Sequence, residues 1–108
     1  MLRGVITVET RLRRVTPVGV FPESDTPALA LESGIADLAG NVWEWTSSAY
    51  QPYPYQTADG REAADADGRV LRGGSWINLG RYCRSALRHG HVPSYRNFST
   101  GFRLAQGR

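Results

Sequence analysis

The side chains that could perform chemistry in this chain are few: one cysteine, two closely spaced histidines and scattered carboxylates. Cys83 has no partner for an internal disulfide, so it also indicates no redox compartment. His89 and His91 could bind a metal ion together, but no carboxylate stands near them in the sequence. We therefore interpret the two histidines as an incidental feature of the sequence rather than as a metal centre.

The most informative stretch is the last third of the chain, residues 70–104. Two recognisable ends, VLRGGSW and GFRL, enclose a middle in which apolar residues follow neither a helical nor a strand period. Arginines recur through this middle, together with Ser85, Ala86 and Pro93. A segment with a regular frame and an arbitrary interior is typical of a surface that displays side chains.

Composition limits the remaining possibilities. The chain has 108 residues, enough for one domain (1–108) with a thin core, and 41% of them are hydrophobic. Its net charge of +3 comes from 13 arginines and no lysine, with acidic residues interspersed. A solvated, arginine-rich surface explains this better than nucleic-acid binding does. No apolar run approaches the ~20 residues of a membrane helix and the start lacks signal-peptide features, so we expect no membrane insertion and no leader.

The elements that must position these residues are short. We expect strands at residues 5–15, 41–46, 69–71 and 101–105, and a short helical turn within 28–38. Residues 50–68 predict a long loop, and loops of this length in compact domains are usually functional or mobile. Helix content should be low.

Two motifs occurring in order resemble those of formylglycine-generating-enzyme-type domains. Residues 34–46, GIADLAGNVWEWT, are similar to the signature GLYDMAGNVWEWT of these domains. Residues 72–76 (RGGSW), 84–86 (RSA) and 101–103 (GFR) match their C-terminal block in order and spacing. The resemblance covers about residues 15–105. It implies an α+β, C-type-lectin-like fold with a small, twisted antiparallel sheet, few helices and much loop.

One kind of member is the oxidase that converts a sulfatase cysteine to formylglycine with two thiolates and copper. Cys83 stands where the second of these cysteines lies, but Asn78 occupies the first position. One thiolate cannot build the paired site that soft Cu(I) prefers, so we expect no copper. Cys83 is interpreted as a small buried hydrophobe. For Arg72 and Arg103 we expect a salt bridge or backbone contact rather than catalysis.

The other kind is the variable protein of diversity-generating retroelements, a ligand-binding protein of phages, bacteria and archaea. There, error-prone copying turns template asparagine codons (AAY) into NNY codons, which cannot encode Lys, Glu, Gln, Met or Trp. All residues at the matching positions here are of the NNY kind, and the fixed positions match except Gly80, where Ala is usual. The resemblance makes 72–104 the variable region, with these ligand-binding positions: Ile77, Asn78, Leu79, Tyr82, Leu87, His89, Gly90, His91, Val92, Tyr95, Asn97, Phe98 and Ser99.

The resemblance also implies a possible calcium site. The matching donors are the carboxylates of Asp37 and Glu44 and the backbone carbonyls of Gly40 and Val42. Oxygen ligands suit this hard cation. The alternative is that the two carboxylates only cap or pair locally.

Three hypotheses follow. The leading one is a non-enzymatic display module that binds a protein or glycan on another cell, phage or host surface. The second is a shortened formylglycine-generating-type oxidoreductase. The third is a structural subunit whose thin core is completed by homo-oligomerisation.

Overall fold

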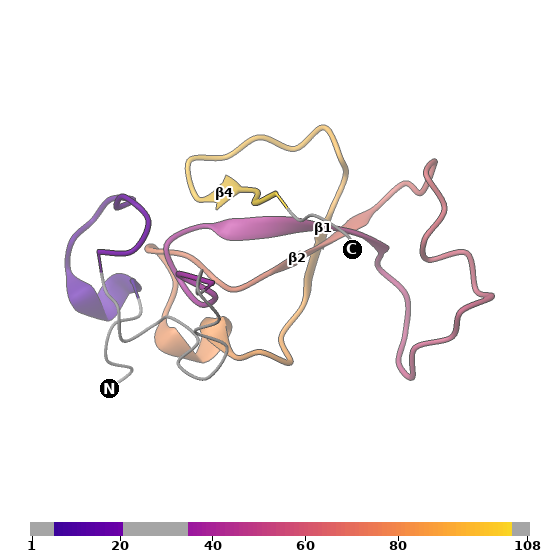
Figure 1. Cartoon of the computed structure of the whole chain (residues 1–108), viewed down its shortest axis with the longest axis horizontal. Helices are drawn as coiled ribbons and strands as arrows, with labels where there is room; N and C mark the ends of the chain where they lie inside the picture. The colour runs from indigo at the N-terminus through magenta and orange to yellow at the C-terminus, as the bar shows by residue number, and fades with distance from the viewer. Residues whose placement is uncertain (1–5, 21–34, 105–108) are drawn as a thin grey trace.

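The chain forms short strands and 3-10 turns joined by long connections (Figure 1). The structure is a computed structural model that describes residues 6–20 and 35–104. Its strands are β1 (Trp43–Ala49), β2 (Arg69–Arg72), β3 (His89–His91) and β4 (Thr100–Gly101), and its 3-10 turns are η1 (Val8–Thr10) and η3 (Gly80–Cys83).

The four strands make one sheet in the order β3-β2-β1-β4. β1 and β2 are antiparallel, with Trp45 opposite Leu71, and β2 and β3 are antiparallel, with Val70 opposite Gly90. β1 and β4 are parallel, with Trp43 opposite Thr100. The small, loop-rich sheet is as expected, but it is mixed rather than purely antiparallel.

The parallel pair has a topological cause. β3 and β4 occupy opposite edges of the sheet, so residues 92–99 must cross it to connect them. Parallel strands require such a crossover connection, whereas antiparallel strands can be joined by a tight turn. Figure 1 shows this connection as the yellow-orange loop beside β1 and β4.

The core is thin, as the composition predicts. Its buried apolar side chains come mainly from β1, β2 and η3: Ile6, Trp43, Ala49, Val70, Leu71 and Cys83. Gly74 lets η3 approach this core, because a Cβ at position 74 would lie 2.5 Å from the Cys83 sulfur. Its φ of +73° also favours glycine.

The strand predicted for residues 5–15 is wrong for its described part. Ile6 makes a single bridge to Gly40, and the chain then turns into η1. The Thr10 hydroxyl donates to the Thr7 carbonyl oxygen at 2.7 Å, so local hydrogen bonds prevail over the β-branched composition. Arg11 and Arg13 follow with φ values of +57° and +56°, which no strand contains.

The other predicted elements agree with the structure to different degrees. The strands predicted at 41–46 and 69–71 correspond to β1 and β2. Of the strand predicted at 101–105, only residue 101 belongs to β4, residues 102–104 form no strand, and residue 105 lies outside the described residues. Of the helical turn expected within 28–38, residues 28–34 also lie outside them, and 35–38 form no helix. Residues 50–68 form the long loop. β3 was not expected, because three residues are too few to show a period.

No helix in residues 6–20 and 35–104 is both long enough and apolar enough to cross a membrane.

Candidate functional site

The candidate site is the 77–99 segment, which follows a path around the sheet. It begins beside η3, forms β3 at one edge and crosses to β4 at the other (Figure 1). The candidate ligand-binding residues are therefore spread over several sides of the sheet instead of forming one compact patch.

Most of the thirteen candidate residues are accessible. Six are exposed: Ile77, Leu79, Tyr82, His89, Val92 and Phe98. Six are half-buried: Asn78, Leu87, Gly90, His91, Tyr95 and Asn97. Only Ser99 is buried, with 7% of its surface exposed. The surface location that a ligand-binding role requires is thus met at twelve of the thirteen positions.

Asn78 has a clear structural contact. Its side-chain oxygen accepts hydrogen bonds from the Trp43 indole at 2.8 Å and from the Ser75 hydroxyl at 2.6 Å. Trp43 and Ser75 are both buried, so each polar group needs a partner inside the protein. Asn78 is therefore part of the support of the segment as well as a candidate contact residue.

Asn97 and Ser99 shape the end of the crossover. The Asn97 side-chain oxygen accepts hydrogen bonds from the Ser99 backbone N–H and hydroxyl, both at 2.8 Å. The Asn97 amide donates to the Tyr95 hydroxyl at 2.7 Å. An asparagine that bonds the backbone two residues later makes a local turn, here leading into β4.

Framework arginines hold the segment by its backbone and by residues outside it. Arg72 donates from Nη1 to the Ser85 carbonyl oxygen at 2.7 Å. Arg88 donates from Nη1 to the Gln51 carbonyl oxygen at 2.6 Å. The structural role predicted for Arg72 is confirmed, since a guanidinium can bond several acceptors at once.

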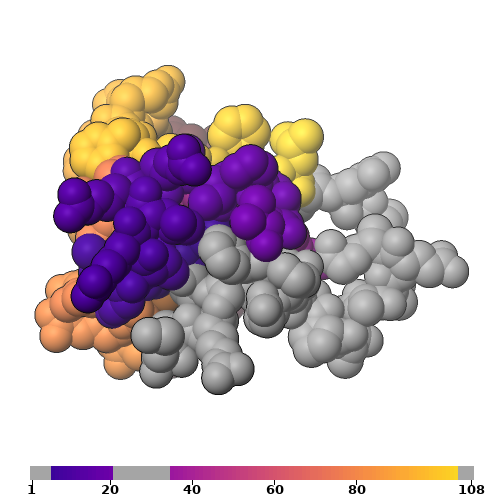
Figure 2. Space-filling model, turned by 90° about the vertical axis from the view of Figure 1, so that its left-hand side faces the viewer, coloured from indigo at the N-terminus to yellow at the C-terminus, as the bar shows by residue number. Residues whose placement is uncertain are grey.

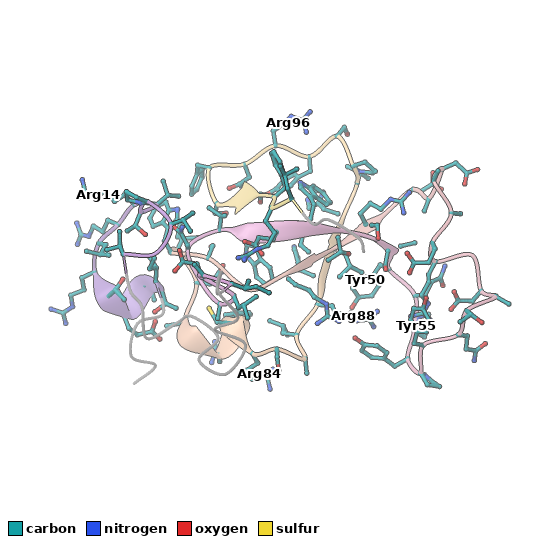
Figure 3. All side chains as sticks on the ribbon, viewed as in Figure 1. Arg14, Tyr50, Tyr55, Arg84, Arg88 and Arg96 are labelled. Atoms are coloured by element: carbon teal, nitrogen blue, oxygen red, sulfur yellow. The ribbon has the colours of Figure 1, made fainter. Side chains whose placement is uncertain are left out.

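Two tyrosines of the 50–68 loop complete this support, and the sequence had not revealed their role. The Arg88 guanidinium lies over the rings of Tyr53 and Tyr50, at 3.9 Å and 4.6 Å from their centroids. Arg72 also donates to the Tyr53 hydroxyl at 2.7 Å. Figure 3 shows Arg88 directed toward Tyr50 at the base of the loop. The long loop and the segment are thus fastened together.

The segment lines hollows that a ligand could enter. One, of about 520 Å³, lies beside β3 and is bordered by His89, His91 and Val92 together with Tyr50 and Asp67 of the loop region. A second, of about 670 Å³, lies beside β4, and its walls include aromatic residues of the crossover and the sheet: Trp45, Tyr95, Phe98 and Phe102. Candidate variable positions and other residues therefore form these walls together.

Gly90 controls the shape of the first hollow. A Cβ at this position would lie 2.8 Å from Cδ2 of Tyr50, a distance that real Cβ atoms do not tolerate. Any other residue at position 90 must displace the Tyr50 ring. One candidate variable position thus sets the place of a constant aromatic wall.

Ring contacts order the segment from within. The rings of His91 and Tyr95 stack with centroids 3.6 Å apart. His89 packs against Trp43 at 5.6 Å, and Phe98 against Trp76 at 5.7 Å. The His91 Nδ1 accepts the Val92 N–H at 3.1 Å. The His91 Nδ1 is thus engaged, and no group of three or more metal-ligating side chains occurs in the described residues.

Comparison with known proteins places this geometry in a family. The sulfatase-modifying factor enzyme 1-like domain matches residues 3–108. The chain belongs to this family. The fold is shared with Treponema denticola variable protein 1, whose structure matches with a TM-score of 0.69 at 28% identity over 93% of this chain and 34% of that chain.

Other sulfatase-modifying factor relatives differ in their named activity. The chain is 40% identical to the inactive C-alpha-formylglycine-generating enzyme 2 of Bos taurus, over 86% of this chain and 27% of that protein. It is 37% identical to the hercynine oxygenase of Mycolicibacterium smegmatis, over 86% of this chain and 23% of that protein. The chain thus spans about a quarter of the length of these relatives. The predicted formylglycine-generating-enzyme-type fold is confirmed by the family match, and the predicted resemblance to variable proteins of this fold by the structural match.

The family's thiol chemistry has little support at Cys83. The cysteine is buried, with 7% of its surface exposed, and the chain has no second one. Burial raises the pKa of the Cys83 thiol to about 11, so at neutral pH it stays protonated. A protonated thiol is a poor nucleophile and a poor metal ligand.

The two carboxylates among the expected calcium donors already have hydrogen-bond partners. Arg103 holds both carboxylate oxygens of Glu44, and the Asp37 Oδ2 accepts the Gly19 N–H at 3.0 Å. Oxygen donors suit calcium, but an ion bound by this set would have to share Glu44 with the Arg103 guanidinium. Calcium binding by Asp37, Gly40, Val42 and Glu44 stays a prediction.

Proposed function

We propose that the chain is a ligand-binding display domain whose region 72–104 is made hypervariable by a diversity-generating retroelement. Its ligand is a protein or glycan on the surface of another cell, a phage or a host. The likeness to Treponema denticola variable protein 1 supports this reading, as does the codon-compatible composition of the thirteen positions.

The observation that carries the proposal is that the arginines that hold the backbone do not bond the candidate ligand-binding residues. The hydrogen bonds of Arg72, Arg88 and Arg103 go to residues outside the thirteen positions. Twelve of the thirteen positions are exposed or half-buried. Side chains can thus change at most of these positions while the bonds that hold the backbone persist.

The side chains of this copy suit recognition. Phe98 is 65% exposed, and Tyr82 is also exposed. Aromatic side chains provide a large contact area at a low entropy cost because they have few rotatable bonds. Phe98 and Tyr95 line the hollow beside β4, which we assign to the ligand, and Tyr82 on η3 offers a separate contact.

The test is a displayed library in which NNY codons replace twelve of the thirteen positions, with Asn78 kept because it bonds the buried Trp43 and Ser75. We expect most members to resist protease, whereas randomising Arg72, Arg88 and Arg103 should give mostly cleaved chains. Selection against purified surface proteins and glycans should then yield binders that differ only at these twelve positions. Equal protease sensitivity of both libraries would contradict the proposal.

A second test uses binders from that selection. Replacing Tyr82, Tyr95 and Phe98 by alanine in a binder that retains them should abolish binding. The variant should still fold, as a retained thermal unfolding transition would show. Loss of folding would instead assign these residues to the core. In the genome, a near-copy of the coding sequence for residues 73–104 beside a reverse transcriptase gene, with adenines at the variable positions, would identify the template.

The alternative is a shortened formylglycine-generating-type sulfatase-modifying oxidoreductase, because a formylglycine-generating enzyme is among the relatives. That function requires tight, thiolate-dependent copper binding. Copper titration of the chain and of Cys83→Ser distinguishes the two functions. We expect no difference between these titrations, because the Cys83 thiol is buried and protonated.

We further propose that the thin core is completed by self-association. Apolar side chains such as Phe102 and Leu104 are 73% and 91% exposed. Size-exclusion chromatography with light scattering should give a mass above that of a monomer. A monomer at all accessible concentrations would contradict this.

A further inference from the structure

A basic hollow lies at the end of the molecule formed by residues 6–20. It has a volume of about 460 Å³ and is lined by Val8, Arg11, Arg13, Trp76 and Ile77. Figure 2 shows the 6–20 segment in indigo on the surface of this end, between the orange and yellow parts of the chain. Four of the five lining residues lie outside the candidate variable positions.

The polar side chains that line this hollow are donors. Within the described residues, the guanidiniums of Arg11 and Arg13 have no hydrogen-bond or ion-pair acceptor. The Trp76 indole nitrogen is buried and has no hydrogen-bond partner among those residues either. Protein atoms cover this nitrogen, so the two arginines are the donors that a ligand in the hollow can reach.

The carboxylate that stands closest in the sequence is engaged elsewhere. Glu9 Oε1 accepts the Gly80 N–H at 2.9 Å, and this hydrogen bond is the main reason that the pKa of Glu9 is lowered. Glu9 is not among the residues that line the hollow. Among the described residues, no carboxylate therefore pairs with either of the two arginines.

The backbone at the two arginines is strained. Both have left-handed φ values, +57° at Arg11 and +56° at Arg13, which non-glycine residues seldom adopt. Such residues persist where the surrounding structure imposes them, and they cluster at ligand-binding sites.

We propose that this hollow binds an oxyanion carried on an apolar body. The Arg11 and Arg13 guanidiniums would bind the anionic oxygens, and Val8, Ile77 and the indole ring would contact the apolar part. Guanidiniums suit carboxylate, phosphate and sulfate groups alike. The proposal does not rest on the display function, because its donors come from residues outside the variable positions.

The experiment titrates the isotope-labelled chain with benzoate, phenyl phosphate and phenyl sulfate, and with neutral benzamide. Nuclear magnetic resonance follows the Trp76 indole N–H and the amides of Arg11 and Arg13. We expect saturable shifts with at least one anion, weaker binding at higher salt, and none with benzamide. The anion that binds most tightly identifies the source of the oxyanion.

The variants are chosen to preserve the backbone. Asparagine adopts left-handed φ more readily than most residues, so Arg11→Asn with Arg13→Asn should weaken binding of the best anion about tenfold or more, since hydrogen bonds to charged groups are the strong ones. Arg14→Asn is the matched control, because Arg14 extends outward from the same loop and does not line the hollow (Figure 3).

Two results would overturn the site. Unchanged anion binding in the double variant would show that Arg11 and Arg13 do not bind the anion. An equal loss of binding in Arg14→Asn would show only diffuse attraction of anions to a basic segment. Thermal unfolding and the amide spectrum show whether the double variant is folded. If it is not, the single variants Arg11→Asn and Arg13→Asn are titrated under the same criteria. None of these results bears on the display library, so the two proposals fail separately.

Discussion

Arg103 grips Glu44 through two parallel hydrogen bonds, from Nε to Oε2 at 2.8 Å and from Nη2 to Oε1 at 2.6 Å. The same guanidinium donates to the carbonyl oxygens of Ala36 and Asp37, both at 2.8 Å. One side chain of the GFRL end therefore joins the start of β1 to the residues that precede it. The structural role predicted for Arg103 is confirmed.

Replacing Arg103 with lysine should destabilise the fold, because a point charge cannot reproduce the fork that bonds three residues. We expect a loss of about 1–3 kcal/mol, limited by partial solvent exposure. Urea unfolding measures it. Arg96→Lys is the control, since Arg96 projects into solvent (Figure 3). Equal stability of the two variants would contradict this role of Arg103.

Asn78→Ala should also destabilise the fold although position 78 is a candidate variable position. The substitution leaves the Trp43 indole and the Ser75 hydroxyl without their acceptor. Each unsatisfied buried group costs about 1–3 kcal/mol. Asn78→Asp keeps an acceptor and should be milder, while the exposed Leu79→Ala should have little effect in the same thermal unfolding assay. A neutral Asn78→Ala would show that the two donors find other acceptors.

Gly90→Ser should leave the chain folded but move the Tyr50 ring. The new Cβ would stand 2.8 Å from that flexible side chain, and the ring can rotate away. We expect loss of the ring-current shifts that Tyr50 imposes on Arg88, measured by nuclear magnetic resonance. Gly68→Ala is the matched control, because its Cβ would meet only one atom, at 3.9 Å. Unchanged Arg88 signals in Gly90→Ser would count against the coupling.

Cys83 should react slowly with a thiol reagent in the native chain at neutral pH. Its pKa is raised to about 11 by burial, so the reactive thiolate becomes abundant only as the pH approaches that value. Reaction should accelerate in denaturant at the same pH, where the pKa returns to its ordinary value. Fast native reaction at neutral pH would reveal an activated thiol and favour the oxidoreductase alternative.

Calcium, if it binds at Asp37 and Glu44, should raise the thermal unfolding temperature, because a ligand of the native state stabilises it. Glu44→Gln should remove this increase, while Asp65→Asn, in the long loop, should retain it. An unchanged unfolding temperature of the parent chain at millimolar calcium would indicate that Arg103 alone satisfies Glu44.

Length and composition predicted the thin core. Short motifs predicted the family and the contacts of Arg72 and Arg103, because these two residues bond backbone groups within the motifs. The same reading missed β3, since His89–His91 is shorter than two strand periods. It missed the clamp of Tyr50 and Tyr53 on Arg88, which joins residues far apart in the sequence.

The strand predicted for the N-terminal segment is wrong for a different reason. Its β-branched residues favour a strand, but the Thr7–Thr10 hydrogen bond and the contact of Glu9 with Gly80 impose a turn. Neither the left-handed backbone of Arg11 and Arg13 nor the hollow beside Trp76 has a signature in residue types alone.

The strand β3 consists wholly of candidate variable positions, yet it pairs with β2 along its length. Ladder bonds between amide and carbonyl groups are indifferent to the side chain that a rewritten codon supplies. Proline is the exception, since NNY codons include it and it has no N–H to donate. Among functional descendants of this gene, proline should therefore be depleted wherever a β3 amide faces β2, and this depletion would reflect the pairing of the two strands.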